Sequence, residues 1–125
     1  MKFKTLMIIK AIVCLGFGLP MVILPEFVYG IFGISLTAGG AFAAREYGAA
    51  MLGNLFITWM ARSSDQSKAR RAIITGMLAY NAVALVASVV TFLLGDFNLI
   101  AWSIVLIYLF FTIGFGYFSL KPPQA

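Results

Sequence analysis

Charged side chains and histidine are what this sequence has least of. Only 10% of its 125 residues are charged and none is histidine, whereas soluble domains carry about 25% charged residues. Without histidine, the usual zinc and haem sites and the Ser-His-Asp triad cannot form. The single cysteine, Cys14, excludes an internal disulfide. We therefore expect a non-enzyme, and we predict no catalytic residue, no metal ligand and no required cofactor.

Apolar residues, by contrast, make up 62% of the chain and gather in long uncharged runs. These runs are Ala11 to Pro25, Tyr47 to Ala61, Ala72 to Gly95 and Phe97 to Leu120. The last two exceed the ~20 residues that cross a bilayer as a helix. We predict one all-α integral membrane domain over residues 1–125, a four-helix bundle with spans at about 5–24, 42–60, 69–94 and 99–120.

The stretch between the first two spans is harder to assign. Residues 26–40 (EFVYGIFGISLTAGG) are apolar but contain four glycines. We predict a short interfacial helix that begins at Pro25 and is followed by a loop. Two alternatives stay open, a re-entrant segment and a fifth span that would need a hairpin directly at Pro25-Glu26.

The basic residues are distributed as a membrane topology requires. Eight of the nine fall on one side of the predicted bundle: Lys2, Lys4, Lys10, Lys121 and four in the segment RSSDQSKARR. The other side carries Arg45 with Glu26, Glu46 and Asp96. The positive-inside rule then places both termini in the cytoplasm. We expect the membrane to be a bacterial inner membrane. Lys10, inside the first span, is expected to extend its ammonium to the headgroups, and nucleic acid is not an expected partner.

Arg45 and Glu46 form the only ionisable pair that we place at or within the outer membrane boundary. Ionisable residues are costly in lipid and are candidates for function. Two interpretations stay open. In the first, Glu46 caps the positive end of the second span while Arg45 pairs with it or with lipid phosphate. In the second, the pair binds a ligand or an ion.

Polar side chains are predicted near the centre of the bilayer. Counting ~1.5 Å per residue places Cys14, Asn54, Asn81 and Thr112 at similar depths, one from each span. Asn54 and Asn81 could hydrogen-bond across the second and third spans, a bond that commonly serves helix packing. Tyr80 lies beside Asn81 and could line a cavity. The tentative ligand-binding set is Arg45, Glu46, Asn54, Tyr80 and Asn81.

One face of the second span consists mostly of small residues, which permit close approach of another helix. Its members at helical spacing are Glu46, Ala49, Ala50, Gly53, Asn54 and Ile57. Ala72 and Gly76 offer a matching small surface near the start of the third span. We predict that Ala49, Gly53, Ala72 and Gly76 pack against other helices, either within the chain or between subunits.

Three stretches carry a resemblance to a known group of proteins. These are LPEFVYGIFGI, AREYGAAMLGNLFITWMAR and RRAIITGMLAYNAVAL, the last after a basic loop and before a final span. With them the chain resembles the small four-span bacterial inner-membrane proteins grouped as DoxX-like and DUF4345-like. The resemblance covers nearly the whole chain. It implies a four-helix topology but no reaction, ligand or catalytic residue.

Two functions are compatible with this sequence. The first is a non-catalytic membrane subunit or scaffold that packs against other membrane subunits or against itself, which the few reactive groups and short loops favour. The alternative is a binding or transport bundle for a lipophilic molecule such as a quinone, a carotenoid or a lipid.

Overall fold

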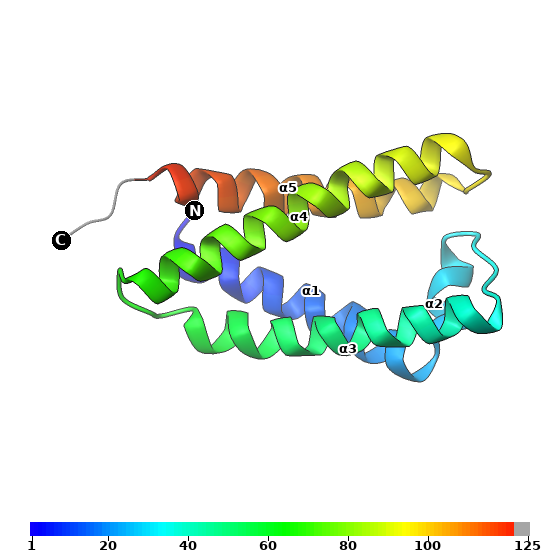
Figure 1. Cartoon of the computed structure of the whole chain (residues 1–125), viewed down its shortest axis with the longest axis horizontal. Coiled ribbons are helices and arrows are strands. Elements are labelled where there is room, and N and C mark those ends of the chain that lie inside the picture. The colour runs from blue at the N-terminus through cyan, green and yellow to red at the C-terminus, as the bar shows by residue number, and fades with distance from the viewer. Residues whose placement is uncertain (122–125) are drawn as a thin grey trace. The chain divides into compact units, whose positions relative to one another are not determined.

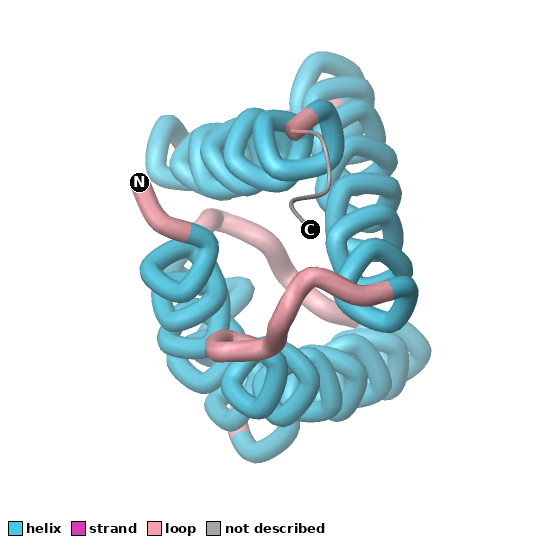
Figure 2. Tube along the Cα trace, turned by 90° about the vertical axis from the view of Figure 1, so that its left-hand side faces the viewer, coloured by secondary structure: helices cyan, strands magenta, loops and turns pink. Residues whose placement is uncertain are grey.

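The computed structural model describes residues 1–121, and all regular elements among them are helical. In chain order they are α1 (Phe3–Ile23), α2 (Pro25–Ile31), α3 (Ala38–Ala61), α4 (Lys68–Leu94), the 3-10 turn η1 (Leu99–Ala101) and α5 (Trp102–Leu120). The loops lie at the ends of the helices (Figure 2). The prediction of an all-α fold is confirmed. The largest shift from a predicted boundary is at α3, which begins at Ala38 rather than at Phe42.

Three of these helical segments are long and apolar enough to cross a membrane. They are α1, α4 and the continuous segment Leu99–Leu120 that joins η1 to α5. The 24 residues of α3 suffice in length, but Arg45, Glu46 and Asn54 lower its apolar character, and α3 is not among the three. The structure is therefore that of a helical protein with membrane-spanning character, and the fourth span stays a prediction.

The chain divides into two compact units, Met1–Arg62 (unit 1) and Ser63–Ala125 (unit 2). Each unit is built on two long helices that lie side by side and run in opposite directions, α1 with α3 and α4 with α5 (Figure 1). The short helix α2 lies in the connection between α1 and α3. Each unit is thus a helical hairpin.

The connection in unit 1 follows from proline and glycine. Pro25 occupies the first turn of α2, where its missing N–H is not needed, and so separates α2 from α1. Gly33 ends α2 with a φ of 78°, a left-handed conformation that favours glycine. The N–H of Ile34 donates to the carbonyl of Tyr29 and that of Gly33 to the carbonyl of Gly30, a Schellman motif. With only seven residues, about 10 Å, α2 is too short to be a fifth span.

The starts of α3, α4 and η1 are capped by side chains. The hydroxyl of Thr37 accepts a hydrogen bond from the N–H of Gly40 (3.0 Å), which begins α3 at Ala38. In unit 2, the Ser67 hydroxyl accepts from the N–H of Arg70 (3.1 Å) and begins α4. Asn98 accepts from the N–H of Ala101 (3.1 Å) and begins η1, which leads directly into α5.

Aromatic rings hold the turn between α4 and α5. The ring of Phe92, in the last turns of α4, lies 5.0 Å from that of Phe97 and 5.7 Å from that of Trp102 (centroid to centroid). Such tilted and edge-to-face pairs contribute stability beyond that of the area that the rings bury. The turn of residues 95–98 therefore folds back with α5 in contact with α4.

The surface of the described chain is strongly apolar. Each long helix exposes several large apolar side chains; Leu94 is 84% exposed, Met60 77% and Val83 69%. In water such a surface would promote aggregation, whereas lipid tails accommodate it. The exposed faces therefore agree with the membrane-spanning character of α1, α4 and the Leu99–Leu120 segment.

Candidate functional site

Arg45 caps the neighbouring helix of unit 1. Its Nε–H donates to the carbonyl oxygen of Val22 at 3.2 Å. Val22 lies in the last turn of α1, where carbonyls lack a partner within the helix and where the helix dipole favours a cation. Arg45 thus compensates the negative end of α1 and ties α1 to α3, a contact that the sequence did not predict.

The first of the two interpretations of Glu46, that it caps the second span, is wrong. α3 begins at Ala38, so Glu46 lies beyond the first turn, and the capping oxygen belongs to Thr37. The sequence interpretation failed because the small residues before Phe42 extend the helix by a further turn. Glu46 is an exposed residue on the surface of α3.

The close helix contact in unit 1 is made by two glycines. A Cβ atom placed on Gly48 would lie 2.8 Å from the carbonyl oxygen of Gly18 and 3.0 Å from the Cβ of Met21. The Cβ of a residue at position 18 would lie 3.1 Å from the carbonyl oxygen of Gly48. Only glycine permits this approach, and it brings the backbones of α1 and α3 together. Gly48 was not among the predicted packing residues, although Ala44 and Gly48 have the same spacing as Ala49 and Gly53.

The four predicted packing residues lie outside the hairpin contacts. Ala49 and Gly53 on α3, and Ala72 and Gly76 on α4, are exposed. A Cβ atom on Gly53 or on Gly76 would meet no atom within 4 Å. Neither small-residue face is therefore covered by the hairpin to which it belongs, and contact with another helix, within the chain or of another subunit, stays a prediction.

Lys10 is buried, contrary to the expectation that it extends to the headgroups. It is 1% exposed and belongs to the same face of α1 as Met7 and Cys14, which are buried as well. The spacing of three and four residues within this face is the signal that should have placed Lys10 inside rather than at the membrane boundary. A buried lysine in a membrane-spanning helix is a functional candidate.

Several polar side chains within the helices donate to their own backbone. The Thr58 hydroxyl donates to the carbonyl of Asn54 (2.8 Å), and the Thr112 hydroxyl to the carbonyl of Tyr108 (2.7 Å). The Nδ2 of Asn81 donates to the carbonyl of Met77 (2.7 Å). Bonds of this kind, four residues back, satisfy polar groups in apolar surroundings. These bonds support a structural role for Thr58, Thr112 and Asn81.

The predicted ligand-binding set is divided between the units. Arg45, Glu46 and Asn54 belong to unit 1, with Asn54 half-buried, and Tyr80 and Asn81 belong to unit 2. The hydrogen bond between Asn54 and Asn81 stays a prediction. Within unit 2, the Tyr80 ring packs edge-to-face with that of Tyr108 on α5 at 6.1 Å between centroids, next to the fully buried Asn81.

Arg71 joins the two helices of unit 2. From the first turn of α4, its Nη1 donates to the carbonyls of Phe118 (3.2 Å) and Lys121 (3.4 Å), and its Nη2 to that of Ser119 (2.8 Å). These carbonyls form the C-terminal end of α5, so Arg71 caps α5 as Arg45 caps α1. The sequence showed Arg71 only as part of a basic loop.

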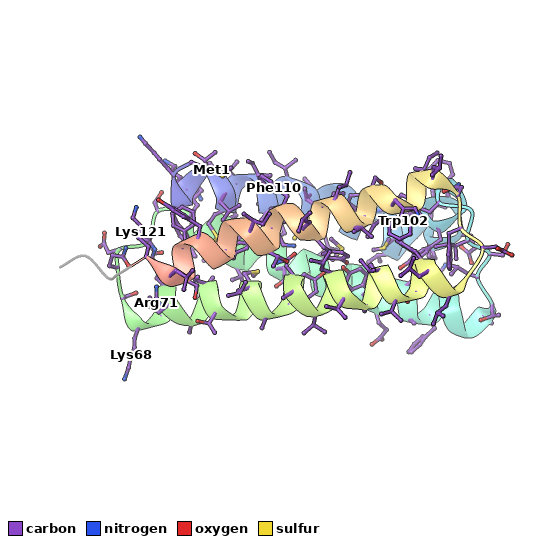
Figure 3. All side chains as sticks on the ribbon, turned by 90° about the horizontal axis from the view of Figure 1, so that it is seen from above. Met1, Lys68, Arg71, Trp102, Phe110 and Lys121 are labelled. Carbon is purple, nitrogen blue, oxygen red and sulfur yellow. The ribbon has the colours of Figure 1, made fainter. Side chains whose placement is uncertain are left out.

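Two lysines flank this cap. Lys68 is the first residue of α4 and Lys121 directly follows α5, and both are exposed. The Nζ of Lys121 lies 5.8 Å from the ring centroid of Tyr117 and 5.9 Å from that of Phe118. Figure 3 shows Lys68, Arg71 and Lys121 at one end of unit 2, opposite the end that holds Trp102.

In residues 1–121, no three or more His, Cys, Asp or Glu side chains are grouped so that they could hold a metal ion. Comparison with protein-family models, with curated proteins and with solved structures finds no match to this chain. The resemblance to DoxX-like and DUF4345-like proteins accordingly stays a prediction.

Proposed function

We propose that this protein is a non-catalytic integral membrane subunit or scaffold that packs against helices of other membrane subunits, or of its own copies. The observation that carries the proposal is a pair of small-residue faces that their own hairpins leave uncovered, Ala49 with Gly53 on α3 and Ala72 with Gly76 on α4. In lipid, helices associate through such small residues four apart, because they allow close backbone contact.

The proposal includes four spans in a bacterial inner membrane, with both termini in the cytoplasm. Its support is the antiparallel pairing of α3 with α1, which is itself apolar enough to span. At about 1.5 Å per residue, α3 is about 36 Å long, enough for a ~30 Å hydrocarbon core. The charge of Arg45 is directed to the end of α1, which lowers the cost of placing it near the membrane boundary.

A second candidate is a binding bundle for a lipophilic small molecule, such as a quinone, a carotenoid or a lipid. It is favoured by the Tyr80–Tyr108 ring pair beside the buried Asn81 in the middle of unit 2. Aromatic walls with few polar groups are typical of sites for such ligands. The hydrogen bond from Asn81 to its own helix supports the scaffold more strongly than this candidate.

The test is native mass spectrometry of the protein extracted from its own membrane in mild detergent. We expect an assembly heavier than the monomer, and we expect Gly53→Leu or Gly76→Leu to reduce its abundance, because leucine fills the close approach of a partner helix. Gly16→Leu is the matched control. Gly16 is likewise an exposed glycine with open space around it, but it lies on α1 outside both faces.

Each outcome decides between the candidates. A monomer in the wild type, or equal loss of the assembly in all three variants, would contradict the scaffold. A monomer that retains a discrete lipophilic molecule would favour the second candidate. Circular dichroism of each variant checks that the helices are intact.

A further inference from the structure

The end of unit 2 that holds the start of α4 and the end of α5 gathers three cations, Lys68, Arg71 and Lys121, which we call the basic end. Lys68 and Arg71 are three residues apart on α4 and therefore share a face. Lys121 is 50 residues from Arg71 in sequence, yet its carbonyl accepts a hydrogen bond from Arg71. In Figure 3, Arg71 lies between the two lysines.

The guanidinium of Arg71 is fixed in place. Its Nη1 donates to two carbonyls at the end of α5 and its Nη2 donates to a third. These hydrogen bonds do not use the Nε–H or the second N–H of Nη2. Donors on these two neighbouring nitrogens have the spacing of two oxygens of a phosphate or a carboxylate. The hairpin thus holds a pre-oriented donor pair, and its orientation needs no anion.

The surroundings of the basic end combine charge with apolar surface. The ammonium groups of Lys68 and Lys121 are exposed on either side of Arg71. Leu120, the last residue of α5, is 86% exposed, and Tyr117 one turn earlier is 57% exposed. An anion bound at the basic end would therefore have apolar side chains directly next to it, where acyl chains could lie.

We propose that the basic end binds the phosphate headgroup of an anionic phospholipid. Arg71 supplies the donor pair, Lys68 and Lys121 supply charge, and the acyl chains lie along the apolar surface at the end of α5. The inference rests on the proposed membrane location of unit 2. It goes beyond the positive-inside rule, which requires basic residues in a loop but no fixed geometry among residues from two helices.

The test uses the purified full-length chain in a neutral detergent, titrated with phosphatidylglycerol or with phosphatidylcholine, with bound lipid counted by native mass spectrometry. We expect Lys68→Gln combined with Lys121→Gln to weaken phosphatidylglycerol binding about thirty-fold, since each cation near an anionic headgroup contributes ~1 kcal/mol and ~1.4 kcal/mol is tenfold. Lys2→Gln combined with Lys4→Gln removes the same charge from unit 1 and should weaken phosphatidylglycerol binding less than the Lys68/Lys121 change does.

Three results would overturn the proposal. These are equal phosphatidylglycerol binding by the Lys68/Lys121 variant and the wild type, an equal loss in the Lys2/Lys4 control, and equal affinity of the wild type for phosphatidylcholine. A parallel titration with inorganic phosphate separates the two sources of the anion. Displacement of the lipid by an equal concentration of phosphate would reject the lipid in favour of a soluble phosphate. Because the assay needs no partner subunit, it can succeed or fail independently of the scaffold proposal.

Discussion

Gly48 of α3 and Gly18 of α1 approach each other so closely that a Cβ atom on Gly48 would lie 2.8 Å from the carbonyl oxygen of Gly18. The obstacle is backbone, which cannot move aside as the end of a flexible side chain can. In an apolar solvent, packing of this kind replaces the hydrophobic effect as the force between helices. The Gly18–Gly48 contact therefore determines how α1 and α3 cross.

The first prediction concerns this contact. Gly48→Ala should destabilise the protein by about 1–3 kcal/mol, the usual cost of overpacking, because α1 and α3 must move apart. Gly53→Ala is the matched control, since Gly53 lies on the same helix with open space around it and alanine favours a helix. Titration with a denaturing detergent, followed by circular dichroism, measures both. Equal stability of the two variants would show that the glycine contact carries no packing energy.

The second prediction concerns the cap of α5. Arg71→Gln removes a cation from three carbonyls at the end of α5, so the last turn should fray. Hydrogen exchange of the Leu120 and Lys121 amides should become about tenfold faster, which corresponds to ~1.4 kcal/mol. Lys68→Gln removes the same charge one turn away and should leave these amides unchanged. Faster exchange in both variants would assign the effect to charge alone.

The third prediction separates the two members of the predicted ionisable pair. Arg45→Gln removes the hydrogen bond to Val22 and should increase hydrogen exchange in the last turn of α1 about tenfold. Glu46→Gln should leave that turn unchanged, because Glu46 is exposed and lies outside the cap. If the Glu46 variant also loosened α1, the two residues would act as a pair after all.

The helices of this fold could be read from the sequence because their signals are local. Long apolar runs, the proline before Glu26 and the turn after Leu94 all act within a few residues. The start of α3 was missed because alanine and glycine residues give little periodic signal, and the Thr37 cap was overlooked. The division into two units depends on contacts between distant residues, which no local pattern records.

The site residues were harder to predict for a related reason. Arg45 and Arg71 were recognised as charges, but their partners are backbone carbonyls 23 and about 50 residues away, and any residue type has a carbonyl. Both faces of α3 contain small residues, so spacing alone could not show that Gly48 rather than Gly53 contacts α1. The direction in which a helix faces its neighbour is set by tertiary packing.

The last prediction tests whether α3 crosses the membrane. In a Cys14→Ala background, single cysteines at Ser35, Ser63 and Asp96 are labelled with a membrane-impermeant thiol reagent in intact cells; all three native residues are exposed, and each lies in a connection between helices. With four spans, Ser35→Cys and Asp96→Cys should react from outside, whereas Ser63→Cys should react only after the membrane is opened. If only α1, α4 and the Leu99–Leu120 segment span, Ser35→Cys and Ser63→Cys must react from the same side and Asp96→Cys from the other. The reactivity of Ser63→Cys relative to Ser35→Cys therefore decides between the two topologies, and labelling of the two on opposite sides would make α3 the fourth span despite Arg45 and Glu46.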